Sequence, residues 1–128
     1  MATKEQTAVM TTKEIANRLA ELCRKGEWAK AQQELYADNA VSIEPMATPA
    51  FEKETKGLKA IIAKGEKFDA MVHEYHSLNI SEPLVTDNCI AFILSMDLTM
   101  KGRPREQMRE ICVYDVIDGK IVSEQFHM

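Results

Sequence analysis

Carboxylates stand at several places in this sequence where the neighbouring residues are apolar and β-prone. Glu44 ends the run "AVSIE" just before Pro45, while Glu110 and Glu124 lie in later runs that alternate apolar and polar residues. A carboxyl group in an apolar cavity loses solvation, so its pKa rises towards neutrality and it becomes suited to taking a proton from a carbon acid or from water. Glutamates near strand ends also reach solvent or pair with a lysine, and the residue pattern leaves both interpretations open.

Histidine and cysteine are the other residues that could do chemistry. His76 points inward if its run is a strand, either as a catalytic or as a structural histidine, but His73 cannot join it in a metal site because strand residues three apart lie on opposite faces. Cys23, Cys89 and Cys112 are odd in number and form no CxxC pair. We therefore expect reduced thiols, with Cys112 as a small hydrophobic residue. No phosphate loop, nucleophile elbow or HExxH helix is present, so we expect no cofactor and no metal.

Helical periodicity dominates the first half of the chain. "TTKE" predicts a capping box with Thr11 as N-cap, and apolar residues then recur at helical spacing up to Gly26. A second helix is predicted over "EWAKAQQELYA", where Trp28 either anchors the core or lines a ligand site, and a third over "GLKAIIAKGEKFDAMV". Between these two helices, "AVSIE" predicts a short strand, and "PMATPAFEKETKG", with two prolines, predicts a loop or lid.

After Phe68 the period changes to two, which indicates strands. In "NCIAFILSMDLTM" one face carries only apolar residues, namely Ile90, Phe92, Leu94, Met96, Leu98 and Met100. The turns "KGRP" and Asp118-Gly119 connect this strand to "REQMREICVYDVI" and "KIVSEQFHM" in an antiparallel meander. If that apolar face is concave, the neighbouring strands turn His76, Glu110, Cys112 and Glu124 towards the same cavity, unless a bulge changes the register.

The length and charge of the chain narrow the class of protein. With 128 residues we expect a single domain over residues 11–128, preceded by a flexible arm over residues 1–10. The net charge of −4 is spread along the chain, and the densest basic run, "KGRPR", contains a turn, so nucleic-acid binding is disfavoured. No apolar run approaches the roughly 20 residues that span a bilayer, and the N-terminus lacks a secretion signal. We expect a cytoplasmic protein that does not enter a membrane.

Helices followed by a curved antiparallel sheet give an α+β fold. This order resembles the cone-shaped fold of the nuclear transport factor 2-like superfamily, also called cystatin-like, which includes SnoaL-like polyketide cyclases and ketosteroid isomerases. The resemblance covers about residues 12–128 and rests on "GEWAKAQQELYADNAVSIEP", Gly57-Leu58, "KGR" and "DGKIV". It implies that about three N-terminal helices pack on a strongly curved, mostly antiparallel sheet around a conical pocket. It also implies that Glu44 takes the place of a general-base aspartate, because "ADNAVSIEP" matches the isomerase pattern "ADDATVEDP".

Departures from the family patterns limit what the resemblance implies about activity. Leu19 stands where ketosteroid isomerases have a tyrosine, and Cys112 or Ile111 stands where they have a protonated aspartate. Neither position supplies a strong oxyanion donor, so ketosteroid isomerase activity is not implied. Glu124 occupies the histidine-like position of the cyclases, and His127 lies on the opposite parity, so a cyclase mechanism is not implied either.

Two classes of function follow from the sequence. The first is a cofactor-independent isomerase, cyclase or hydrolase that uses acid–base chemistry on a small apolar organic ligand, with Glu44 and His76 as catalytic candidates. The alternative is a non-catalytic module for ligand binding or dimerisation. A closed cavity in which Glu44 has a perturbed pKa and a second polar group close by would favour the enzyme, whereas a water-filled cavity with an ionised Glu44 would favour the module. Both are compatible with a homodimer through the convex sheet face, where Ile111 and Val113 alternate with inward residues. The predicted ligand-binding residues are Trp28, Leu94, Met96, Leu98, Glu110, Cys112, Glu124 and Phe126.

Overall fold

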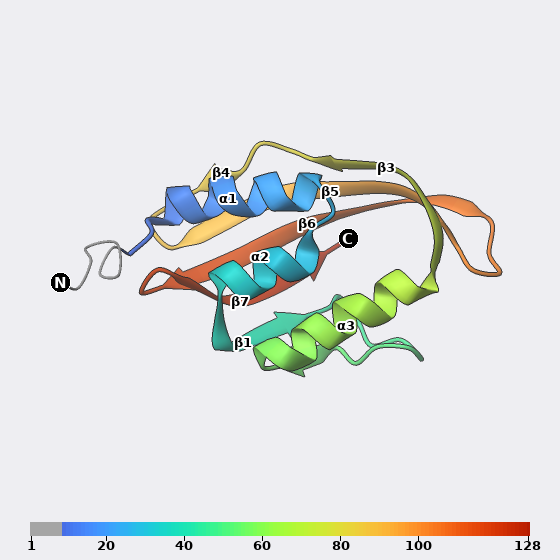
Figure 1. Cartoon of the computed structure of the whole chain (residues 1–128), viewed down its shortest axis with the longest axis horizontal. Coiled ribbons are helices and arrows are strands. Elements are labelled where there is room, and N and C mark those ends of the chain that lie inside the picture. The colour runs from blue at the N-terminus through green and yellow to red at the C-terminus, as the bar shows by residue number, and fades with distance from the viewer. Residues whose placement is uncertain (1–8) are drawn as a thin grey trace.

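A computed structural model describes residues 9–128 and shows three helices packed on a curled, unclosed and mostly antiparallel sheet (Figure 1). The helices are α1 (Thr12–Arg24), α2 (Trp28–Leu35) and α3 (Leu58–Met71). The strands are β1 (Tyr36–Ile43), β2 (Glu54–Lys56), β3 (Val72–Ile80), β4 (Leu84–Val85), β5 (Cys89–Met100), β6 (Arg105–Ile117) and β7 (Lys120–His127). The predicted α+β class and cone-shaped architecture are confirmed. The predicted arm over residues 1–10 lies outside the described residues, apart from Val9 and Met10.

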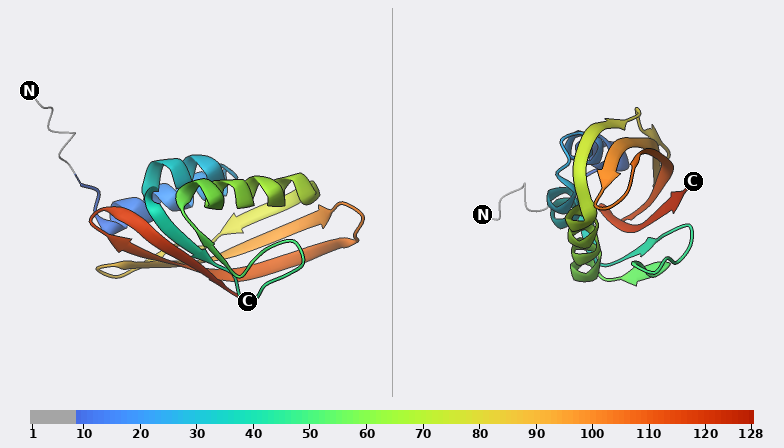
Figure 2. Two further views of the ribbon diagram at one scale, coloured as in Figure 1. Left: turned by 90° about the horizontal axis from the view of Figure 1, so that it is seen from below. Right: turned by 90° about the vertical axis from the view of Figure 1, so that its right-hand side faces the viewer.

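The sheet has the strand order β2-β1-β7-β6-β5-β3, with β4 paired to β5. Strands β1 and β7 run parallel, and the other pairs are antiparallel. Figure 2 shows that the helices lie along one side of this sheet and that the sheet curls around them. A curled sheet covered on its concave side by helices encloses space between the two layers.

Two short edge strands were not predicted. The prolines in "PMATPAFEKETKG" indicated a loop over the whole segment, yet Glu54–Lys56 forms β2 by pairing with the last residues of β1. Leu84–Val85 likewise forms β4 by pairing with Ile90 and Ala91. Both strands exist because a neighbouring strand offers free hydrogen-bonding groups, which is a tertiary effect that local composition does not carry.

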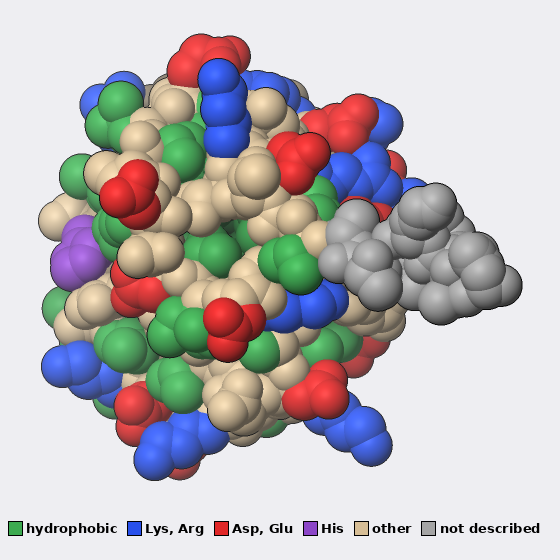
Figure 3. All heavy atoms as spheres, turned by 90° about the vertical axis from the view of Figure 1, so that its left-hand side faces the viewer, with side chains coloured by type: hydrophobic (Ala, Val, Ile, Leu, Met, Phe, Trp, Pro, Cys, Tyr) green, Lys and Arg blue, Asp and Glu red, His purple; other side chains and the backbone are tan. Residues whose placement is uncertain are grey.

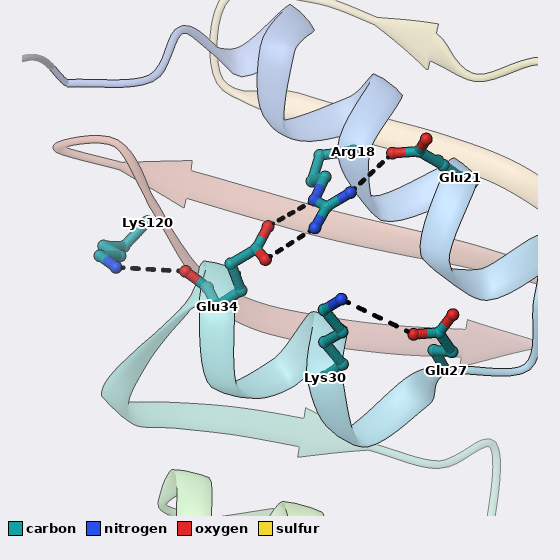
Figure 4. Close-up of polar contacts among 6 residues, drawn as sticks. All are labelled: Arg18, Glu21, Glu27, Lys30, Glu34 and Lys120. Carbon is teal, nitrogen blue, oxygen red and sulfur yellow. Dashed lines mark hydrogen bonds and ion pairs between the residues drawn. The ribbon is translucent and has the colours of Figure 1, made fainter.

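Helix α1 begins as predicted and is tied to α2 by charge. Thr11 and Glu14 form the predicted capping box. Arg18 donates two hydrogen bonds to Glu34 on α2, at 2.6 and 2.9 Å, and a third to Glu21 (Figure 4). Lys120, at the start of β7, donates to the backbone carbonyl of Glu34 at 3.4 Å. The two parallel hydrogen bonds from the Arg18 guanidinium fix the orientation of the Glu34 carboxylate, so they hold α2 in place over the sheet.

The core lies between the helices and the inner face of β5 and β6. The predicted apolar face of β5 is buried along its whole length, including Ile90 and Leu98, which are fully buried. Helix α1 covers it with Ile15, Leu19 and Leu22. At the Asp118-Gly119 turn both residues have positive φ, 50° and 75°, as a two-residue hairpin between twisted strands requires. The turn starts the pairing of β6 with β7, and a register shift between Asp115 and Val116 then brings Glu124 opposite Tyr114 and Phe126 opposite Cys112.

The surface carries charges of both signs. On the face that Figure 3 shows, acidic and basic side chains are interspersed and neither sign forms a large patch. Within residues 9–128, no helix combines the length and the apolar character needed to cross a membrane.

Candidate active site

A cavity of about 390 Å³ lies between the helices and the inner face of the sheet. Its wall is mostly apolar and aromatic, and α2, α3, β5, β6 and β7 all contribute to it. The segment after β1 closes one side with Pro45, Met46 and Phe51. Lys67 holds this segment against α3, since its ammonium lies 5.1 Å from the centre of the Phe51 ring and donates to the carbonyl of Ala50. A largely apolar cavity of this size suits a small organic molecule.

Most residues that the sequence suggested for the site line this cavity. From the predicted set, the wall contains Trp28, Glu44, Leu94, Met96, Glu110, Cys112, Glu124 and Phe126. They come together because each strand of the meander turns alternate residues inward, so that Leu94 pairs with Glu110 and Tyr114 with Glu124.

The two other predicted residues, His76 and Leu98, do not line the cavity. Strand β3 has a register shift between Tyr75 and Ser77, so His76 is the bulged residue and its parity is lost. Its Nε2 lies 2.8 Å from the hydroxyl of Thr99, and its Nδ1 lies 3.5 Å from Glu74. Tyr75 takes the inward direction instead and lines the cavity. The inward placement of His76 is therefore corrected, and Leu98 is a core residue.

Glu124 is a buried carboxylate held by two hydroxyl groups. It is 4% exposed, the hydroxyl of Tyr36 donates to its Oε1, and the hydroxyl of Ser42 donates to its Oε2 at 2.6 Å. Burial raises the pKa of Glu124, while the hydrogen bonds from Ser42 and Tyr36 and the charge of Lys64 act in the opposite direction. The two donors are what make a carboxyl group tolerable at this depth.

Lys64 connects this carboxylate to Glu44. Its ammonium donates to the hydroxyl of Ser42 at 2.6 Å and to Oε2 of Glu44 at 2.7 Å. It also lies 5.7 Å from the centre of the Phe126 ring. Glu44 follows β1 directly, where its backbone N–H donates to the carbonyl of Lys53 at 2.7 Å. Tyr36, Glu124, Ser42, Lys64 and Glu44 thus form one continuous chain of hydrogen bonds along the cavity wall.

Glu110 differs from the other two glutamates of the wall. Within residues 9–128 its carboxyl group has no hydrogen-bond or ion-pair partner. Burial raises its pKa to about 7, the nearby charges of Glu44 and Glu124 raise it as well, and Lys64 lowers it. A carboxyl group with this pKa is present in both protonation states near neutral pH, which is the condition for acid–base work.

Sequence reasoning missed Lys64, Ser42 and the role of Tyr36. Lys64 follows Ile61 by three residues and precedes Phe68 by four, so it shares their inward face of α3. Ser42 precedes Glu44 by two residues and shares its face of the chain. A lysine on an otherwise apolar helix face was therefore the available signal for the cation that Glu44 binds.

The two buried cysteines are not activated as nucleophiles. Cys23 and Cys112 are free and buried, and burial raises the pKa of both thiols, that of Cys23 to about 12. A protonated thiol is a poor nucleophile. Among residues 9–128, no group of three or more His, Cys, Asp or Glu side chains is placed to hold a metal ion.

Comparisons with known proteins agree with this architecture. The family model of the SnoaL-like domain matches residues 10–128. A crystal structure of a candidate SnoaL-like polyketide cyclase from Mesorhizobium loti is 32% identical, with a TM-score of 0.86 over 93% of this chain and 100% of that chain. Among the curated proteins, none matches.

Two more distant structures share the fold alone. One is TerC co-crystallised with polyporic acid, which is 9% identical with a TM-score of 0.73 over 90% of this chain and 88% of that chain. The other has a ketosteroid isomerase-like fold, comes from Catenulispora acidiphila and is in complex with trimethylamine. It is 18% identical with a TM-score of 0.70 over 92% of this chain and 87% of that chain.

Proposed function

This chain belongs to the SnoaL-like domain family, and we propose that it binds a small, largely apolar organic molecule in its cavity and acts on that molecule by cofactor-independent proton transfer. The observation that carries the proposal is the Lys64–Glu44 pair in the wall of a mostly apolar cavity. A carboxylate and an ammonium side by side offer a proton acceptor and a hydrogen-bond donor to one bound molecule.

We assign the role of general base to Glu44 and that of electrophilic partner to Lys64. The ammonium of Lys64, 2.7 Å from Oε2 of Glu44, holds the Glu44 side chain in place at the cavity wall. The ammonium of Lys64 can donate to a substrate oxygen as negative charge develops there, which takes the place of the oxyanion donors that ketosteroid isomerases have and this chain lacks. Two solved relatives of the same fold hold small organic molecules, polyporic acid and trimethylamine, and this supports a ligand-binding cavity.

The proposed reaction is tested with 2-tetralone, a small apolar ketone whose C–H groups beside the carbonyl are acidic. In D₂O a base removes one of these protons, the enolate takes a deuteron back, and NMR follows the loss of the proton signal. We expect the protein to accelerate this exchange with saturation. Glu44→Gln should bind the ketone within about tenfold of wild type and lose about 10²–10⁴-fold in rate.

Glu52→Gln, an exposed glutamate in the segment after β1, is the matched control and should exchange like wild type. Binding without accelerated exchange would remove the enzyme and leave the non-catalytic binding module. No binding at all would contradict the proposed ligand class.

We also propose that the protein is a homodimer through the convex sheet face. Ile93 and Ile111 pair directly across β5 and β6, and they are 41% and 48% exposed on the side away from the cavity. Adjacent exposed isoleucines on a sheet face favour burial against a second surface. A second copy of the same chain fits, because an outer face of mixed charge and apolar residues can be complementary to itself.

A further inference from the structure

The carboxyl groups of the cavity outnumber its cations. Glu44, Asp69, Glu110 and Glu124 line it, while Lys64 is the one lysine or arginine that residues 9–128 contribute to the wall. Lys64 is engaged by Glu44, and Asp69 accepts a hydrogen bond from the Tyr75 hydroxyl at 2.7 Å. Burial raises the pKa of the tyrosines and of the buried thiols in the wall, so these groups are uncharged at neutral pH. When the carboxyl groups of the cavity are ionised, its unbalanced charge is negative.

Glu110 is the carboxyl group on which this excess of negative charge acts. It stands on the inner face of β6 opposite Leu94, between Met108 and Cys112, so apolar side chains surround it on its own strand and on β5. Glu110 is neither a hydrogen-bond partner of Lys64 nor a partner of the two hydroxyl groups that donate to Glu124. Burial disfavours the charged form of Glu110 most, and the charges of Glu44 and Glu124 disfavour it more than Lys64 favours it. The electrostatic potential at Glu110 therefore attracts positive charge.

An aromatic ring in the same wall, that of Phe126, already contacts the ammonium group of Lys64. Phe126 pairs with Cys112, which places it diagonally across from Glu110 on the inner face. The ammonium of Lys64 lies 5.7 Å from the centre of its ring, within the range of a cation–π contact. A cavity that combines aromatic rings with an unpaired carboxyl group has the composition that recognises quaternary and tertiary ammonium groups.

We propose that the cavity selects organic molecules that carry a positively charged nitrogen, and that Glu110 is the residue that pairs with this nitrogen. The proposal rests on the proposed function, because it adds a charge requirement to the ligand of the same cavity. Apolar parts of the molecule would contact the aromatic wall. The Lys64–Glu44 pair stays free to act on another part of the molecule.

The test compares two probes of nearly the same shape, choline and 3,3-dimethylbutan-1-ol, in which carbon replaces the charged nitrogen. Binding is followed by NMR of ¹³C-methyl methionine, since Met96 and Met108 line the cavity and Met100 does not. Around pH 8.5, where Glu110 is ionised, we expect choline to bind at least about tenfold more tightly than the alcohol. Around pH 5.5, where Glu110 is protonated, this preference should disappear.

Glu110→Gln should show no preference for choline around pH 8.5 or around pH 5.5, while still binding the alcohol. Glu106→Gln is the matched control, because Glu106 lies on the same strand but is exposed and outside the cavity, and it should keep the wild-type preference. Equal binding of the two probes around pH 8.5, or a preference that survives in Glu110→Gln, would overturn the inference and leave the proposed function standing. If neither probe nor 2-tetralone shifts Met96 or Met108, both are contradicted.

Discussion

The ammonium of Lys64 lies 2.7 Å from Oε2 of Glu44, and the two side chains are only 14% and 26% exposed. One comes from α3 and the other from the residue directly after β1, so this pair joins the helical layer to the sheet at the edge of the cavity. Without Lys64, the partly buried carboxylate of Glu44 would have no cation to offset its lost solvation, and the folded state would be destabilised. The pair therefore contributes both to the fold and to the chemistry assigned to the cavity.

Replacing Lys64 with methionine should destabilise the protein. The substitution keeps the apolar stem but leaves Glu44 and Ser42 without their donor, and we expect a loss of about 1–3 kcal/mol in the free energy of unfolding. Urea denaturation followed by circular dichroism measures this. Lys59→Met, at an exposed position of α3, should change the free energy by no more than about 0.5 kcal/mol. Equal losses in the two variants would show that the Lys64–Glu44 pair has no special weight.

The hydroxyl of Tyr36 should matter more as the pH rises. Tyr36→Phe removes a donor from the buried Glu124 carboxylate, which raises the pKa of Glu124 further above its value in the unfolded chain. Such a raised pKa lowers stability as the pH rises, because the folded state holds a proton that the unfolded state releases. We expect a loss of about 1–3 kcal/mol at neutral pH and a smaller loss in acid.

Denaturation of Tyr36→Phe around pH 5 and around pH 8 is the measurement. Tyr75→Phe serves as the control, since it removes a hydrogen bond between Tyr75 and Asp69 at a position that is 38% exposed. A pH-independent loss in Tyr36→Phe would contradict the assignment of its hydroxyl to the Glu124 carboxylate.

Because of Glu110, the free energy of unfolding should fall as the pH rises from acid to neutral. Its pKa is about 7 in the folded protein against an ordinary value of 4.5, so the penalty is absent below the lower value and fully present above the higher one. The shift corresponds to about 3 kcal/mol if the whole effect reaches the stability. Glu110→Gln should therefore flatten the fall in stability across this range, as measured by thermal unfolding in a series of buffers. A wild-type fall that persists unchanged in the variant would assign it to another group.

The homodimer predicts a specific response to a charge on the outer face. Light scattering of the wild type at micromolar concentration should give twice the mass of the chain, which is 14.5 kDa. Ile111→Asp should give the monomer mass with the circular dichroism of the wild type, because Ile111 is outside the core. A wild-type monomer, or a variant that stays dimeric, would exclude this interface.

The fold could be predicted from the sequence because its local patterns agree with one another. The capping box at Thr11, the apolar row of β5 and the Asp118-Gly119 turn each specify a local geometry, and together they lead to the observed sheet. Alternation within β6, and within β7 beyond the register shift at Asp115 and Val116, is why Glu110 and Glu124 were found.

The features that could not be predicted from the sequence depend on contacts between distant elements. His76 left the inward set because β3 bulges between Tyr75 and Ser77, and no turn residue marks that bulge. The partner of Glu44 is twenty residues further along the chain, on a helix whose lysine could as well have faced solvent. Strand β2 exists only through its pairing with β1.

The central claim is that the cavity binds a small, largely apolar organic molecule, and methionine NMR tests it most directly. In a protein labelled with ¹³C at the methionine methyl groups, titration with 2-tetralone should shift the signals of Met96 and Met108, which line the cavity. The signal of Met100, which is buried on the same strand β5 but outside the cavity, should stay in place. The predicted result is saturable shifts at Met96 and Met108, with the other cavity methionines Met46 and Met128 free to shift and Met100 unchanged. Unchanged signals for Met96 and Met108, or an equal shift at Met100, would contradict the claim.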